Sequence, residues 1–504
     1  MLGQILSTLI LAIGVLIVAN LLGQEDFGLL NTAMAPVSIA MIFQDMGVNS
    51  ALIKYISQNR HEKKRGNLKV ILESGIILTF VTSFILTGIV FLSSGYLAER
   101  VYGIVELGPL IRWLSLMIMG QSLLTTAYGI TVGYERMELR SGLQVFYSFM
   151  KSIAAPILVY IGYGVFGAIM GELVPVIITG ALGLFFIVLI YSKEREYQGS
   201  LSLIDATKMI VGYSSPLFFS RVLTGVQPHI YTSLLVIAFG SIMTGNWNAV
   251  LRFSALLAFV TMPISTTLFP LFSKLENKIS ELKFIYQNSV KFSTLFAYPI
   301  AVAIMVLSDQ IASVLLSDYE FASLFLKIYM LTFIWIGIGS NSNGALMNSH
   351  RMTKETFQIT VIQFLITIPA SFYIIPKYGV IGLIGLLFVS GFVGNLFSLK
   401  IIWGSFSFIF DLTSFIKLIA AAILTFFIST FFVNRLNINP WLEIFLGGTF
   451  TFIIYFILIL MIQVLDENDI RYLSNIADSL GPLAVPMNIV LEIIRKLVRL
   501  ANHR

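Results

Sequence analysis

The chain has 504 residues, of which 57% are hydrophobic and only 12% are charged, with a mean hydropathy of +0.89 and a formal net charge of +6. A soluble domain carries about 25% charged residues, so this composition excludes a soluble globular protein. The sequence contains no cysteine, which excludes disulfides, thiolate metal sites and cysteine nucleophiles.

Apolar runs long enough to cross a bilayer recur along the whole chain. They predict an all-α, polytopic membrane protein with about fourteen transmembrane helices. The first run has no cationic n-region and no cleavage site within reach, so we expect a retained span and not a signal peptide. The predicted spans are 5–22, 27–44, 70–92, 110–132, 143–162, 165–191, 209–239, 247–272, 292–316, 322–347, 357–375, 380–402, 413–433 and 441–463.

Lysine and arginine are distributed unevenly among the loops. With the N-terminus inside, 24 of the 32 basic residues fall in cytoplasmic segments and 6 in outer segments. The positive-inside rule therefore predicts a multi-pass protein of the cell (plasma) membrane with both termini cytoplasmic. The basic run NRHEKKRGNLK is then a cytoplasmic loop facing anionic membrane lipids, and we expect no nucleic acid partner. The tail, residues 464–504, ends in MNIVLEIIRKLVRLANHR, which predicts an interfacial amphipathic helix.

A short motif occurs twice. YGVFGAI at 163–169 returns as YGVIGLI at 378–384, 215 positions later, and further matches keep a similar register. An even number of spans per copy gives parallel repeats, which enclose a central cavity and can rock around it. The prediction is a transporter with an N-terminal six-helix lobe (1–191), a cytoplasmic linker (192–208), a C-terminal six-helix lobe (209–402) and two additional transmembrane helices (413–463).

Several segments carry a family resemblance: LLGQEDFGLLN (21–31), DMGVNSALIKYIS (45–57), NAVLRFSALLAFVTMPISTTLFPLFSKL (248–275) and LLSDYEFASLFLKI (315–328). Residues 1 to about 460 resemble the polysaccharide-biosynthesis flippases (O-antigen and capsule repeat-unit, Wzx-type) of the multidrug/oligosaccharidyl-lipid/polysaccharide exporter superfamily. The resemblance implies alternating access and a lipid-linked, pyrophosphate-bearing oligosaccharide as substrate. Many relatives have an acidic residue in span 7, whereas QPHIYTSLLV here has none, and Gln24 stands where relatives often have proline.

Four basic residues within or beside spans are candidates for binding the substrate, because intramembrane charges are costly and usually functional. Arg221 and His229 lie in span 7 and Arg252 in span 8, and guanidinium suits phosphate oxygens. Lys151 lies in span 5, at a depth similar to that of Glu172. Structural alternatives stay open: Arg221 could bond backbone carbonyls freed by Pro216 or Pro228, Arg252 could snorkel outward, His229 could cap backbone, and Lys151 could pair with Glu172.

Other classes of protein fit less well. A multidrug/cation antiporter of the same superfamily is the main alternative, but the predicted cavity is net basic. A polysaccharide polymerase or ligase would need a large outer loop and a catalytic constellation, and a primary pump would need a nucleotide-binding loop. The prediction is therefore a flippase, not an enzyme, with no cofactor and no metal site, and with a counter-ion left open.

Overall fold

The computed structural model describes residues 2–62, 65–194, 201–254, 257, 268, 271–273, 275, 278–465 and 469. These residues form helices and turns, with no β-strand among them, so the predicted all-α class is confirmed. The predicted amphipathic helix near the C-terminus lies outside the described residues.

The chain forms two compact units. Unit 1 comprises Met1–Ala255, Leu315–Phe321 and Phe364–Leu386, and unit 2 comprises Leu256–Val314, Ala322–Gln363 and Leu387–Arg504. The predicted lobes, 1–191 and 209–402, are a division by sequence repeat and remain a prediction.

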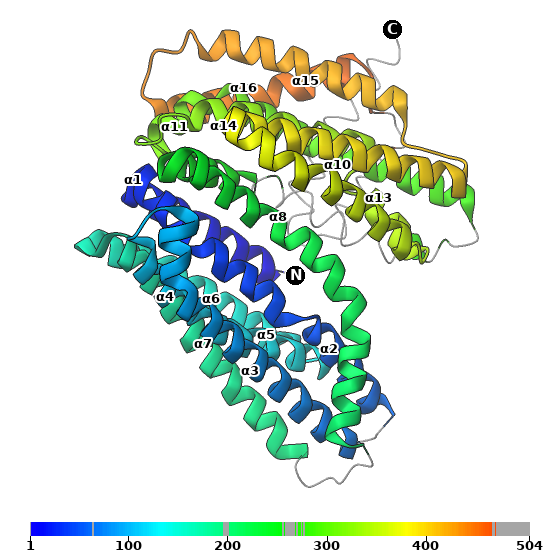
Figure 1. Cartoon of the computed structure of the whole chain (residues 1–504). Coiled ribbons are helices and arrows are strands. Elements are labelled where there is room, and N and C mark those ends of the chain that lie inside the picture. Colours follow the sequence, from blue (N-terminus) through cyan, green and yellow to red (C-terminus); the bar gives the residue numbers. More distant parts are fainter. Residues whose placement is uncertain are drawn as a thin grey trace. The chain divides into compact units, whose positions relative to one another are not determined.

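The helices of unit 1 pack closely around α1. This helix contacts α6, α8 and α3, while α5, α6 and α7 pack against one another (Figure 1). The elements are α1 (Leu2–Asp45), α2 (Val48–His61), α3 (Arg65–Tyr96), the π-helical turn η1 (Leu97–Tyr102), α4 (Leu107–Ser115), α5 (Met117–Gly133), α6 (Met137–Leu158), the π-helical turn η2 (Val159–Tyr163), α7 (Gly164–Glu194) and α8 (Leu203–Arg252).

Unit 2 has a core around the ring of Tyr286, which packs against Phe408 and donates a hydrogen bond to Asn343 at 2.7 Å. Helix α14 (Thr353–Phe406) is divided between the two units, because its middle, residues 364–386, belongs to unit 1. The elements that follow α8 are α10 (Ile279–Val306), α11 (Ser308–Leu315), α12 (Ala322–Tyr329), the 3₁₀ helix η3 (Met330–Ile338), α13 (Asn343–Ser349), α14 (Thr353–Phe406), α15 (Leu412–Val433) and α16 (Pro440–Met461).

The internal repeat is visible in the backbone. Gly23 in α1 (φ 75°, ψ 177°) and Gly240 in α8 (φ 78°, ψ −176°) break their helices with almost the same angles. Gly164, the first residue of α7 (φ 52°, ψ −137°), and Gly379 in α14 (φ 59°, ψ −142°) form a second matched pair. These angles are open only to glycine, because a Cβ would collide with the backbone. The two copies of the sequence motif thus build the same break at the same place.

The breaks explain how the helices relate to the predicted spans. At 1.5 Å per residue, a straight helix as long as α1, with 44 residues, would exceed twice the thickness of a bilayer core of ~30 Å. Each break instead divides one continuous helix between two predicted spans. Within the described ranges nine helices are long and apolar enough to cross a membrane, or ten if the bent pair Ala322–Ile338 and Asn343–Ser349 counts as one span. The number of fourteen crossings therefore remains a prediction, while a multi-pass membrane protein is established.

Within unit 1, α1 and α8 cross at two glycines in a reciprocal arrangement. A Cβ added to Gly28 would lie 1.9 Å from the carbonyl oxygen of Ser241, and one added to Gly245 would lie 1.9 Å from that of Gln24. Gln24 and Gly28 follow the break at Gly23, and Ser241 and Gly245 follow the break at Gly240 with the same spacing along the chain. Asn246 adds a hydrogen bond from its Nδ2 to the Oε1 of Gln24 at 2.8 Å. The duplicated segments therefore meet backbone to backbone, as they would around a local two-fold axis.

The short segment Leu315–Phe321 packs onto this crossing. Tyr319 donates a hydrogen bond from its hydroxyl to the carbonyl of Ala19 at 2.7 Å, and the amide of Phe321 donates to Oδ1 of Asn246 at 3.0 Å. These bonds satisfy polar groups next to the glycine breaks, where the helical hydrogen bonding of the backbone is interrupted.

Candidate functional site

Unit 1 contains a cavity of about 320 Å³ between α1, α6, α7 and α8. At ~30 Å³ per water molecule, it has room for roughly ten waters. Three of the four predicted site residues line it, namely Lys151, His229 and Arg252. The other lining residues are Gly14, Val15, Val18, Phe27, Leu30, Asn31, Met34, Ser38, Ser152, Ala155, Ala168, Glu172, Pro228, Thr232, Asn248 and Leu251.

Lys151 and Glu172 form an ion pair across the α6–α7 interface. The Nζ of Lys151 lies 2.5 Å from Oε2 of Glu172, and the two side chains are only 18% and 13% exposed. A Cβ on Gly171 would lie 2.2 Å from Cα of Ala155, so the two helix backbones touch one residue from Glu172. This contact holds the pair together. The expected pairing of Lys151 with Glu172 is confirmed, and both residues also face the cavity.

Arg252 is held more loosely. It is the last residue of α8, and its Nη2 approaches Oδ1 of Asn31 in α1 at 3.4 Å, a long contact. Its Nε is buried without a hydrogen-bond partner among the described residues. The guanidinium therefore has donor capacity that its contacts with the described residues leave unused. The alternative in which Arg252 points outward does not fit this position.

His229 lines the same cavity from the middle of α8. Pro216, Gly225 and Pro228 in this part of the sequence predict an interrupted helix, because proline and glycine weaken helices, and this prediction is wrong. The helix α8 continues past Pro216, Gly225 and Pro228, and its backbone leaves helical geometry only at Gly240. A proline removes one backbone hydrogen bond but does not by itself end a membrane helix, because neighbouring helices support it.

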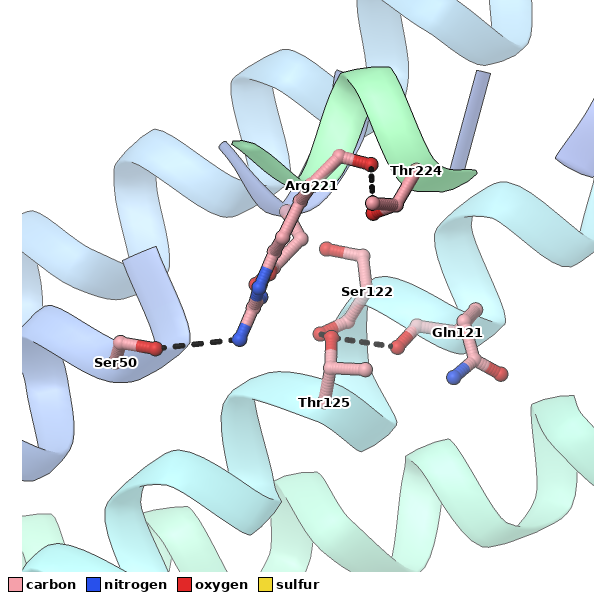
Figure 2. A network of polar contacts seen from close by, with 7 residues as sticks. Ser50, Gln121, Ser122, Thr125, Arg221 and Thr224 are labelled. Carbon is pink, nitrogen blue, oxygen red and sulfur yellow. Dashed lines mark hydrogen bonds and ion pairs between the residues drawn. The ribbon is translucent and has the colours of Figure 1, made fainter. Parts of the chain in front are cut away.

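Arg221 lies apart from the cavity lining. Its guanidinium forms an ion pair with Asp45 at the end of α1. It also donates a hydrogen bond to the hydroxyl of Ser50 in α2 at 3.3 Å (Figure 2). The turn that places these partners contains Gly47, whose φ of 76° is left-handed and whose Cβ would lie 2.9 Å from the carbonyl of Ser214 in α8. The role of Arg221 as a substrate ligand remains a prediction.

Sequence reasoning did not identify several polar residues of the cavity. Asn31 and Asn248 are in predicted spans, and Ser152 donates to the backbone carbonyl of Ile10 at 2.8 Å. Asparagine within an apolar run is the signal that could have found the first two, because an unsatisfied amide in a bilayer is costly. Among the described residues, no three His, Asp or Glu side chains lie close enough to hold a metal ion.

A second cavity, of about 370 Å³, lies within unit 2. Its walls are apolar and carry no charged residue, so it offers nothing to a charged headgroup. It is lined by Tyr298, Ala301, Val302, Met305, Met330, Leu331, Phe333, Ile334, Ile419, Ala422, Ile423, Phe426 and Phe427.

Comparison with solved structures places the fold among membrane exporters and flippases. The structure is similar to that of the lipid II flippase MurJ in an inward closed conformation, with a TM-score of 0.73 and 18% identity, covering 90% of this chain and 97% of that one. It is also similar to an inward-facing multidrug resistance MATE family transporter of the MOP superfamily, with a TM-score of 0.61 and 15% identity, covering 78% of this chain and 95% of that one.

At the level of sequence, residues 1–276 match the family described as polysaccharide biosynthesis protein. The chain belongs to this family, and the predicted family resemblance is confirmed. An uncharacterized membrane protein of Methanocaldococcus jannaschii is 22% identical over 389 residues, which are 73% of this chain and 87% of that protein.

Proposed function

We propose that this protein is a flippase that moves a pyrophosphate-linked oligosaccharide lipid from the cytoplasmic to the outer leaflet by alternating access. The observation that carries the proposal is the cationic cavity of unit 1. Its described lining has two basic residues, Lys151 and Arg252, that are charged at neutral pH, and one acidic residue, Glu172. An excess of positive charge inside a membrane protein needs an anionic partner.

The size of the cavity fits part of such a substrate. A diphosphate group fits easily within the 320 Å³ available, whereas a whole oligosaccharide does not. In the described conformation, Arg252 and Lys151 would bind the diphosphate, and His229 and Asn248 would add polar contacts. Arg221, now bound to Asp45, would contribute on the path of the headgroup once it releases that partner.

The topology belongs to the same proposal. We assign both termini to the cytoplasm of a cell membrane on the strength of the basic-residue bias. A membrane potential that is negative inside then favours outward movement of the anionic headgroup. The lobes 1–191 and 209–402 are the bodies that we expect to move.

One observation favours a second candidate, a cation exporter. Glu172 is the kind of buried acid that a cationic compound needs, and one structural neighbour is named a multidrug resistance transporter. However, the Glu172 carboxylate is already neutralised by Lys151 at 2.5 Å. A cation would have to displace Lys151 and enter beside Arg252, which opposes it.

Reconstitution tests the proposal. Purified protein in vesicles that contain a labelled polyprenyl-pyrophosphate oligosaccharide should raise the fraction of glycan that an added glycosidase can cleave, relative to protein-free vesicles. We expect Arg252→Ala to slow this at least about tenfold, because a hydrogen bond to a charged group contributes ~1.5–3 kcal/mol.

The matched control is Arg435→Ala, which removes an exposed cation outside the cavity and should change nothing. Equal rates for wild type and Arg252→Ala would refute the role of the cavity. Uptake of a cationic dye against a proton gradient, with no effect on the glycan lipid, would favour the second candidate.

A further inference from the structure

The Lys151–Glu172 pair is placed where an incoming anion must disturb it. Both side chains line the cavity, and their ion pair at 2.5 Å is mostly buried. Lys151 also lies 5.9 Å from the ring centre of Tyr147, one turn earlier in α6. A diphosphate in the cavity would compete with Glu172 for the same ammonium group.

The competition has an electrostatic consequence for Glu172. An ion pair in a low-dielectric site is stable only while both charges are present. If Lys151 turns to the diphosphate, the Glu172 carboxylate is left beside an anion with its partner gone. A carboxylate that loses its counter-charge and gains a like charge takes up a proton.

We propose that Glu172 is the proton-coupling residue of this protein, which exchanges its ion pair with Lys151 for a proton when an anionic diphosphate headgroup binds. The inference rests on the proposed function for the chemical class of the ligand. The proton comes from water in the cavity and adds to the Glu172 carboxylate. When the headgroup leaves, the acid returns the proton to water and its pair with Lys151 forms again.

The other groups around the carboxylate support this assignment. From α6, Lys151 is paired with the carboxylate and Tyr147 lies beside Lys151, and from α8, Arg252 and His229 share the cavity. The elements α3, α4, α5 and η2 also pack on α7. Among the described residues they contribute none to the cavity wall, and α1 contributes no titratable one. Glu172 is therefore the acid that a bound anion would meet first.

The assignment also accounts for a feature of the sequence. The stretch QPHIYTSLLV of span 7 has no acidic residue, so it supplies no carboxylate to the cavity. An acid in α7 can serve the same cavity, because α7 and α8 both line it. Re-formation of the ion pair would also help to expel the headgroup, since Glu172 then competes for Lys151.

Calorimetry can count the protons directly. Farnesyl pyrophosphate and, separately, inorganic pyrophosphate are titrated into purified protein in detergent, in two buffers of different ionisation enthalpy. The difference in heat gives the protons taken up per bound anion. We expect wild type to take up about one proton more per bound anion than Glu172→Gln does. After correction for the ionisation of the ligand itself, the affinity of wild type for the anion should rise by up to about tenfold for each unit by which the pH is lowered.

Two further variants separate the proposal from a structural role. Lys151→Met keeps Glu172 but removes the exchange, so its proton uptake should fall to the Glu172→Gln level. Asp45→Asn removes an acid that is paired with Arg221 outside the cavity lining, so it should behave as wild type. Equal proton uptake by wild type and Glu172→Gln would overturn the proposal.

The possible outcomes distinguish this inference from the proposed function. Diphosphate binding without extra proton uptake overturns the coupling role and leaves the flippase proposal standing. Failure of both ligands to bind overturns both. Proton-linked binding of inorganic pyrophosphate alone, together with no glycan-lipid movement in vesicles, supports the exchange at Glu172 and counts against a lipid substrate.

Discussion

The crossing of α1 and α8 gives a prediction that the structure fixes closely. In Gly245→Ala the new methyl group would lie 1.9 Å from the carbonyl oxygen of Gln24, whereas real Cβ contacts are almost never below 3.0 Å. This oxygen belongs to the backbone, so the clash cannot be relieved by the movement of a side chain. The two helices must separate by roughly 1 Å, and such overpacking costs about 1–3 kcal/mol or more. We expect a lower thermal unfolding temperature for the purified protein in detergent.

The control for this experiment is Gly212→Ala, in the same helix. A Cβ at Gly212 would meet no atom of the described residues within 4 Å, so this substitution should be neutral or stabilise by about 0.5–1 kcal/mol, because alanine favours the helix. Gly28→Ala presses on the same crossing, so the double variant with Gly245→Ala should lose less than the sum of the two single losses. Equal unfolding temperatures for Gly245→Ala and Gly212→Ala would show that α1 and α8 do not meet in this way.

Three further outcomes are expected. Lys151→Met leaves the buried carboxylate of Glu172 unpaired and should lower the free energy of unfolding by up to about 3–5 kcal/mol. Adding Glu172→Gln should restore part of this loss in thermal unfolding, and a double variant no more stable than Lys151→Met would contradict the ion pair. Arg221→Ala should slow glycan-lipid movement in vesicles more than Asp45→Asn does, although both variants remove the same ion pair. Equal effects would assign Arg221 a structural role. Tyr319→Phe loses a hydrogen bond to a backbone carbonyl of α1 and should cost about 1 kcal/mol in the same unfolding assay, with an unchanged value counting against that bond.

Much of the fold could be predicted because a bilayer restricts the choices. Long apolar runs with few charges can only be helices, since every backbone group in lipid must be bonded within its own segment. The repeated motif also indicated a duplication, and the matched angles at Gly164 and Gly379 agree with it. The continuity of α8 past Pro228 could not be predicted, because the support that neighbouring helices give to a proline depends on packing.

The site was predicted less completely. Composition and span position singled out Lys151, His229 and Arg252 as costly intramembrane groups, and all three line one cavity. The same reasoning gave Arg221 equal standing with Arg252. The sequence could not tell the two arginines apart, because their partners, Asp45 and Asn31, are far away along the chain.

The sequence alone determined that this is a helical membrane protein with a duplicated plan and an excess of positive charge in its interior. These properties follow from local composition, which decides whether a segment enters the bilayer. Only the tertiary structure decided which charges are neutralised and which remain available. That outcome depends on distances of a few ångströms between helices, which are set by close contacts such as that of Gly171 with Ala155.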